Sequence, residues 1–307
     1  MTQKLRGLIP LFFSALALLT SCNGTHSSRK IFLKEGEPLE GSHLSRVIYG
    51  PDSRLDLFQV IDQRTRRQAR SVAALIANKD LQEWDSHHFE LKSSSLGEAY
   101  GLCSSEAFLD QKNPAFCTGF LVAPHVLVTA GHCILNDSEC AETSFIFGFS
   151  IEEPGTPYWI RPKTDAYRCK RLLHTESGES ETDFAVIELD RPAPPDRQPL
   201  PLRRKGKIQS LDLVSMLGHA LGLPLKQTMG RVIETSKYHF STSLDSFGGN
   251  SGAPVFNTLD GTVEGVFRGG DEDFEQKEGC FTSKKCTEKT CQGEVVTSIS
   301  EIFPYLR

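Results

Sequence analysis

The sequence lacks the features that mark several protein classes. Its 307 residues carry no strong excess of one charge, because 34 Lys and Arg face 39 Asp and Glu, for a net charge of −5. That balance of charges argues against sequence-independent binding to the phosphates of nucleic acids. No internal repeat is evident, and no long helices alternate with strands as they do around a parallel sheet. A hydrophobic content of 38% still suffices to bury a core, which excludes a disordered or collagen-like chain.

Long hydrophobic runs are also missing, with one short exception near the start of the chain. Residues 8–19 are apolar apart from Pro10 and Ser14, and Lys4 and Arg6 precede them. A membrane-spanning helix needs about 20 apolar residues, so this run is too short. A charged head followed by a short apolar stretch indicates a secretory signal peptide over residues 1–21.

The end of this signal resembles a bacterial lipobox, since Leu19, Thr20 and Ser21 precede Cys22. Cleavage there would leave Cys22 as a lipidated first residue that anchors the chain to a membrane. An ordinary signal peptide that contains a cysteine is the alternative. Residues 22–46, rich in Gly, Ser, Lys and Glu, are predicted to be a tether or short propeptide. We therefore expect the protein to be attached to the bacterial cell envelope, with the outer membrane mildly preferred, or to be secreted.

Nine cysteines are present, and removing Cys22 leaves an even eight. In an exported chain these favour disulfides over free thiols. Zinc bound by Cys280, Cys286 and Cys291 is the alternative.

Short β-branched and aromatic runs, separated by Gly, Pro, Asn or Asp, recur through the rest of the chain. This spacing is typical of an all-β barrel or sandwich. Apolar residues at helical spacing near the end predict a short amphipathic helix over residues 297–306. The predicted strands cover residues 71–76, 118–122, 126–129, 144–147, 184–189, 212–217, 230–234, 254–256 and 262–267.

The first segment with candidate chemistry is CTGFLVAPHVLVTAGHC, residues 117–133. Two strands end in small residues, which allow a sharp turn that would project His132 into a cleft. A disulfide between the cysteines at the two ends, Cys117 and Cys133, could hold the strand pair together beside His132. On its own, His132 could equally be a packed core residue or half of a metal site.

The second segment is TDFAVIELDRP, residues 182–192, in which Asp183 begins an apolar strand. A partly desolvated carboxylate requires a partner. The His132 imidazole would satisfy it, and the bond would fix the tautomer that leaves the other ring nitrogen free to act as a base. A turn-initiating aspartate is the simpler alternative.

The third segment is DSFGGNSGAPVF, residues 245–256, in which glycines flank Ser251. A tight turn here would expose the hydroxyl and aim the Gly249 and Ser251 N–H groups at one point, as an oxyanion hole requires. The order His132, Asp183, Ser251 is that of chymotrypsin-type enzymes. An α/β-hydrolase needs a histidine after its nucleophile, whereas the last histidine here is His239.

Taken together, the three segments resemble the trypsin/chymotrypsin clan, in its bacterial trypsin-like and glutamyl-endopeptidase-like branch. Weaker similarities lie at residues 47–54, 218–224 and 265–270, so the resemblance covers residues 47–307. It implies a chymotrypsin-like double β-barrel with the active site between the barrels. Ser251 would attack the scissile carbonyl, His132 would shuttle the proton, Asp183 would orient it, and Gly249 with Ser251 would bind the oxyanion. The resemblance also implies a Cys117–Cys133 disulfide.

The chain departs from animal trypsins at Asn250, where those enzymes place the aspartate that pairs with a newly cut amino terminus. Residues 45–48 nevertheless resemble a processing site, with cleavage between Arg46 and Val47. For specificity, Asp245 matches the base of the trypsin pocket and favours Arg or Lys, although glutamyl-endopeptidase relatives also carry an aspartate near this point. Phe267 stands where glutamate-specific relatives have a histidine, and Arg268 could neutralise Asp245 or line the pocket.

These residues predict a monomeric, exported serine endopeptidase acting on protein or peptide substrates, with a preference for Arg or Lys. We expect no cofactor, metal or nucleic acid partner. The alternatives are a catalytically silent trypsin-like fold that binds protein, and a metal-binding Cys/His module.

Overall fold

The computed structural model describes residues 46–177, 181–270, 273–287 and 293–306. Contacts divide the chain into two units, residues 1–42 and 43–307, and all described residues belong to the second. The predicted signal peptide, Cys22 and nearly all of the predicted tether lie outside the described residues. Within those residues, no helix is long and apolar enough to cross a membrane.

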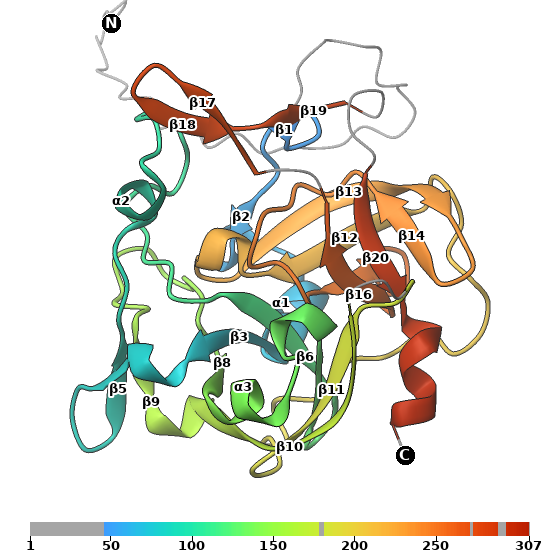
Figure 1. Ribbon diagram of the computed structural model, residues 1–307, viewed down its shortest axis with the longest axis horizontal. Helices are drawn as coiled ribbons and strands as arrows, with labels where there is room; N and C mark the ends of the chain where they lie inside the picture. Colours follow the sequence, from blue (N-terminus) through green and yellow to red (C-terminus); the bar gives the residue numbers. More distant parts are fainter. Residues whose placement is uncertain (1–45, 178–180, 271–272, 288–292, 307) are drawn as a thin grey trace, which may run out of the picture. The chain divides into compact units, whose positions relative to one another are not determined.

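Six antiparallel strands close the first barrel, which occupies the lower part of Figure 1. Around the barrel their order is β10-β11-β7-β6-β3-β8. Strands β6 and β7 are joined by a tight turn, and β3 pairs with both β6 and β8. The strands are β3 (Val72–Ala77), β6 (Cys117–Ala123), β7 (Val126–Thr129), β8 (Thr143–Phe147), β10 (Ala166–Glu176) and β11 (Phe184–Leu189).

A second ring of six strands has the order β12-β15-β16-β20-β14-β13 and closes through a β12–β13 pairing. Strand β2 (Leu55–Asp56) extends it by pairing with β13. The ring consists of β12 (Leu213–Gly218), β13 (Lys226–Thr235), β14 (His239–Thr242), β15 (Pro254–Asn257), β16 (Val263–Gly269) and β20 (Glu294–Ser298). The double-barrel prediction is therefore confirmed.

Short strands and helices lie outside the two barrels. The hairpin of β17 (Phe274–Lys277) and β18 (Cys280–Ser283) projects beside α2 (Leu96–Tyr100), as Figure 1 shows. The remaining elements are β1 (Arg46–Val47), which pairs with β19 (Lys285–Cys286), the sheet β4 (Leu81–Glu83), β5 (His88–Leu91) and β9 (Ile160–Pro162), and the helices α1 (Gln63–Ala69) and α3 (Asp137–Ala141).

The two barrels share one hydrophobic cluster. Phe120 and Val128 of the first barrel pack in it with Val263 and Val266 of the second, and all four are fully buried. Burying a side chain of this size contributes about 1.5–3 kcal/mol. This shared core fixes the interface at which the candidate site lies.

The C-terminal segment forms a 3₁₀ helix, η6 (Ile299–Tyr305), where a short amphipathic helix is predicted. Ile299 and Ile302 are buried in the shared cluster, so the predicted apolar face is correct. Pro304 lies inside the helix, and its ring and missing N–H are unfavourable for a regular α-helical turn.

Three disulfides join described cysteines: Cys103–Cys280, Cys117–Cys133 and Cys140–Cys169. Cys286 is also disulfide-bonded. Cys280 and Cys286 are thus oxidised, which removes the thiolates that a zinc site would need.

Candidate active site

His132 lies in a single 3₁₀ turn, η3 (Gly131–Cys133), directly after β7. The turn requires glycine at its start, because a Cβ at Gly131 would lie 1.8 Å from the Glu176 carbonyl oxygen. The Cys117–Cys133 disulfide ties this turn to the first residue of β6. The His132 side chain remains 43% exposed, so the ring is accessible.

Asp183 precedes β11 and is 3% exposed. Its Oδ2 lies 2.7 Å from His132 Nδ1, and its Oδ1 accepts the His132 backbone N–H at 3.0 Å. The carboxylate therefore holds both the ring and the main chain of the histidine. A proton on Nδ1, donated to Asp183, leaves the lone pair of Nε2 available to accept a proton.

Ser251 lies on the loop between β14 and β15, and backbone bonds attach this loop to both barrels. The Ser251 carbonyl accepts from the Thr118 N–H of β6 at 2.8 Å, and the Gly252 N–H donates to the Phe267 carbonyl of β16 at 2.7 Å. Glycine is required at 252, because its φ is +88° and a Cβ would lie 2.0 Å from the Thr118 carbonyl oxygen. The loop is thus held against the strand pair that precedes His132.

The Ser251 hydroxyl donates to the Arg268 carbonyl oxygen at 3.3 Å. Among the described residues it has no hydrogen bond to His132. Catalytic hydrogen bonds are often long or misaligned without substrate.

Gly249 has a φ of +88°, and a Cβ there would lie 2.5 Å from the His219 carbonyl oxygen. Its own carbonyl accepts from Thr118 Oγ1 at 2.8 Å, which fixes the peptide plane. Within the described part of the chain, neither the Gly249 nor the Ser251 N–H donates to a protein acceptor. Both amides are therefore available to an incoming oxyanion.

Asp245 is not at the base of a substrate pocket, contrary to the sequence-based expectation. It is 1% exposed, and its carboxylate accepts from the Tyr49 N–H at 2.6 Å, the Ser53 N–H at 2.7 Å and the Ser53 hydroxyl at 2.5 Å. Burial raises the pKa of Asp245 to about 7, although the Ser53 donors favour the charged form. The carboxylate anchors the N-terminal segment instead.

That segment follows the predicted processing site. Arg46 and Val47 pair with β19, and Ile48 is fully buried in a cluster with Leu221 and Phe247. The residues after Arg46 therefore pack against the start of the Ser251 loop.

Phe267 and Arg268 occupy different surroundings. Phe267 is buried and lines a cavity of about 220 Å³ beside Ser251. Arg268 instead lies near the candidate relay, with Nε 3.6 Å from Asp183 Oδ2. The structure therefore brings Phe267 to the cavity wall but not Arg268.

Two acidic residues that no sequence pattern indicated, Asp273 and Glu294, also line this cavity. Glu294 begins the buried strand β20. The signal that could have identified it is the one that singled out Asp183, an acidic residue in front of a β-branched run.

A buried histidine, His219, lies behind the loop and was not predicted to belong to the site. His219 is 1% exposed, stacks on Phe149 and places Nδ1 2.9 Å from the Leu223 carbonyl oxygen. Burial lowers the pKa of His219 to about 4. Because this ring is neutral near pH 7, it adds no charge beneath Gly249.

One trio of potential metal ligands lies close together within the described ranges: Cys117, His132 and Cys133. Its two sulfurs are bonded to each other. The set therefore offers no thiolate, and its residues do not fit a metal centre.

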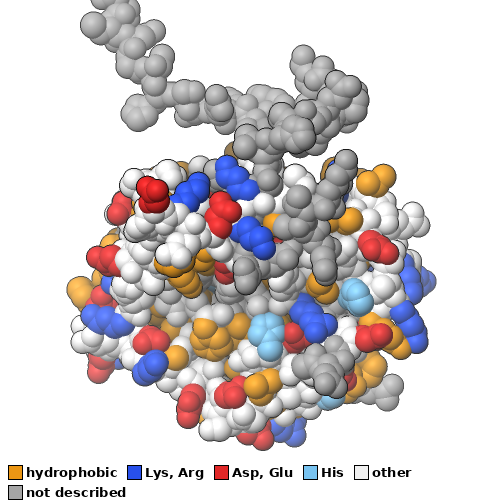
Figure 2. Space-filling view, turned by 45° about the horizontal axis from the view of Figure 1, so that its top comes forward, with side chains coloured by type: hydrophobic (Ala, Val, Ile, Leu, Met, Phe, Trp, Pro, Cys, Tyr) orange, Lys and Arg blue, Asp and Glu red, His pale blue; other side chains and the backbone are white. Residues whose placement is uncertain are grey.

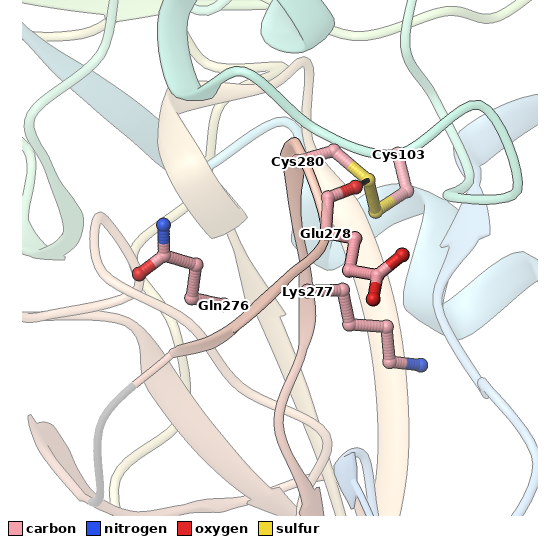
Figure 3. Close-up of a pocket in the computed structure, with 5 residues that line it drawn as sticks. All are labelled: Cys103, Gln276, Lys277, Glu278 and Cys280. Carbon is pink, nitrogen blue, oxygen red and sulfur yellow. Dashed lines mark hydrogen bonds between the residues drawn. A yellow bond between two sulfur atoms is a disulfide. The ribbon is translucent and has the colours of Figure 1, made fainter.

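A larger, open cavity of about 850 Å³ lies at the β17–β18 hairpin. Figure 3 shows the Cys103–Cys280 disulfide beside it, with Gln276 pointing away from Lys277 and Glu278. It shares no lining residue with the cavity beside Ser251. Basic and acidic side chains are interspersed over the face shown in Figure 2.

Part of the chain is similar to known peptidases. Residues 117–266 match the family described as the trypsin-like peptidase domain. An extracellular metalloprotease of Bacillus subtilis is 26% identical over 158 residues, 48% of this chain and 47% of its own. A glutamyl endopeptidase of Bacillus licheniformis is 26% identical over 153 residues, 46% of this chain and 45% of its own. The chain thus spans about half the length of these relatives.

A solved structure of a Glu endopeptidase in complex with MPD superposes with a TM-score of 0.47 at 18% identity, covering 79% of this chain and 95% of that one. The matched segment, residues 117–266, contains His132, Asp183 and Ser251 and includes strands of both barrels. That segment is therefore similar to the trypsin-like peptidase domain.

Proposed function

We propose that the chain is an exported serine endopeptidase that hydrolyses peptide bonds through an acyl-enzyme on Ser251. His132 Nε2 would take the proton of the Ser251 hydroxyl as the oxygen attacks the scissile carbonyl. Collapse of the tetrahedral intermediate would break the C–N bond, and His132 would return the proton to the leaving amine. Water, activated by the same imidazole, would then release the acid product and the free serine.

The observation that carries this proposal is the 2.7 Å contact between Asp183 and His132, made on the barrel to which the Ser251 loop is bonded. A buried carboxylate that holds one ring nitrogen of an accessible histidine stabilises the imidazolium formed during attack. The Gly249 and Ser251 N–H groups would stabilise the oxyanion, each donor accounting for about 10²–10³-fold in turnover.

A catalytically silent protein-binding fold is the second candidate. The observation in its favour is the Ser251 hydroxyl, which donates to the Arg268 carbonyl instead of to His132. A serine that stayed in this rotamer would not be activated.

Labelling by a fluorophosphonate distinguishes the two candidates. We expect the purified protein to be labelled at a single site and the Ser251→Ala variant to remain unlabelled, because the reagent reacts with an activated serine. An exposed serine, Ser300, supplies the matched control, and Ser300→Ala should label like the parent. A folded protein that resists labelling would favour the silent fold.

We also propose that the chain is exported and anchored through a lipid on Cys22, with release by cleavage between Arg46 and Val47. The three disulfides support an oxidising compartment. Cells fed an alkyne fatty acid should label the full-length protein and not the Cys22→Ser variant. Equal labelling of both would contradict the anchor, and loss of the segment before Val47 from the mature protein would support processing.

A further inference from the structure

Two adjacent glycines, Gly248 and Gly249, precede the candidate nucleophile, and the second carries one of the candidate oxyanion donors. Because glycine has no Cβ, a peptide between two glycines can rotate at little steric cost. Such a rotation would turn the Gly249 N–H away from an oxyanion. The loop therefore needs contacts that hold this peptide in one orientation.

Three hydrogen bonds hold the pair of glycines. The Gly248 carbonyl accepts from the Leu221 N–H at 2.5 Å, and the Gly249 carbonyl accepts from Thr118 Oγ1 at 2.8 Å. The Gly248 N–H donates to Asp273 Oδ2 at 2.9 Å. A Cβ at Gly248 would lie 3.0 Å from the same oxygen, so the carboxylate packs directly against the first glycine.

Asp273 lies directly before β17, and the β17–β18 hairpin fixes its main chain. The Lys284 N–H, just after β18, donates to the Asp273 carbonyl at 2.9 Å. The hairpin is in turn attached to the segment that follows α2, through the Cys103–Cys280 disulfide. Two hydroxyls of β18 also donate to the Glu106 carboxylate, at 2.6 and 2.5 Å. The main chain of Asp273 is therefore fixed independently of the Ser251 loop.

The surroundings of Asp273 bring the hairpin against the loop and favour a charged carboxylate. The ring centroid of Phe274 lies 6.1 Å from that of Phe247, a buried residue of the loop, and 5.3 Å from that of Tyr100 in α2. The buried Arg54 guanidinium lies over the Phe247 ring, 4.3 Å from its centroid. Burial raises the pKa of Asp273, and the Arg54 cation opposes this shift. A charged carboxylate accepts a stronger hydrogen bond than a neutral acid does.

We propose that Asp273 is a positioning residue, which holds the Gly248–Gly249 peptide so that the Gly249 N–H points toward the oxyanion. The proposal rests on the proposed peptidase function, because an attacked carbonyl gives that N–H its role. A misplacement of about 1 Å in a reacting geometry can cost 10²-fold in rate. Because the oxyanion exists only after attack, the loss of Asp273 should appear in kcat rather than in substrate binding.

Steady-state kinetics of three variants test this role. Asp273→Ala should lower kcat for a peptide substrate about 100-fold and leave KM within about threefold of the parental value. Asp273→Asn should keep kcat within about tenfold of the parental value, since its amide oxygen can still accept the Gly248 N–H. Glu275→Ala, at an exposed position of β17, is the matched control and should keep the parental kcat. A kcat for Asp273→Ala equal to that of the control, or a loss confined to KM, would overturn the proposal.

Amide hydrogen exchange, measured by NMR, provides a readout that does not need catalysis. The Asn250 N–H donates to the Phe247 carbonyl at 3.1 Å, so its exchange reports on the loop itself. In the Ser251→Ala background, Asp273→Ala should accelerate this exchange at least about tenfold, whereas Glu275→Ala should leave it unchanged. Unchanged exchange in Asp273→Ala would overturn the positioning role, and fluorophosphonate labelling of the parent would then leave the peptidase function standing. Accelerated exchange, with a parent that resists labelling, would refute the peptidase function and support the role of Asp273 in holding the loop.

Discussion

Replacing Ser251 by alanine should lower kcat for a peptide substrate by about a million-fold. The reason is that the oxygen that forms the acyl-enzyme is lost, while the oxyanion donors and the cavity remain. The only hydrogen bond of the side chain is a 3.3 Å contact with the Arg268 carbonyl, in the part of the chain that the structure describes. We therefore expect an unchanged thermal unfolding transition, measured alongside steady-state kinetics.

The Asp183→Asn variant should lose less activity than Ser251→Ala. The amide would hold His132 in the wrong tautomer, and kcat should fall about 10⁴-fold. Retention of more than a few per cent of kcat in folded Ser251→Ala would contradict the assignment of the nucleophile. A loss in Asp183→Asn as small as that of a surface substitution would contradict the orienting role.

Replacing Asp56 by leucine should lower the free energy of unfolding by about 3–5 kcal/mol. Asp56 pairs with Lys226, which is 1% exposed, and Gln111 bonds to both, with Oε1 2.7 Å from Lys226 Nζ and Nε2 3.0 Å from Asp56 Oδ2. Burial lowers the pKa of Lys226 to about 8 even though Asp56 opposes the shift. Without Asp56 the buried cation would lose the carboxylate bonded to it, and urea unfolding would measure the lost stability.

The double variant Asp56→Leu/Lys226→Met is the control for this prediction. It removes both charges and should recover most of the lost stability. The deficit of the single variant should also shrink as the pH rises toward about 8, because without Asp56 the buried lysine discharges at a lower pH than in the parent, where its pKa is about 8, while the unfolded chain still binds the proton. A deficit that is independent of pH, or a double variant as unstable as the single one, would contradict the ion-pair explanation.

The strands could be predicted because their sequence signals are local. Each of the nine predicted runs coincides with or overlaps a strand, since β-branched and aromatic residues between turn formers fit a pleated, half-buried surface. Strand β10 was missed because charged residues interrupt its apolar pattern, for example Arg168, Lys170 and Arg171. Spacing at the C-terminus predicts a helix and its buried face, but it does not distinguish a 3₁₀ helix from an α-helix.

The candidate relay could be predicted in part, since His132, Asp183 and Ser251 each lie in a segment whose glycines or apolar neighbours signal a constrained turn or strand end. The lining of the cavity beside Ser251 could not be predicted. Asp245 lies six residues before Ser251, but donors from Tyr49 and Ser53, about two hundred residues away in the chain, occupy its carboxylate. Proximity in sequence does not determine which acidic side chain faces a cavity that distant strands complete.

Thr118 bonds to two successive parts of the Ser251 loop, through its hydroxyl to the Gly249 carbonyl and through its N–H to the Ser251 carbonyl. A single residue of the first barrel thus bonds to two points of a loop that belongs to the second barrel. Neither barrel, produced as a separate fragment, would contain all the residues of the candidate active site.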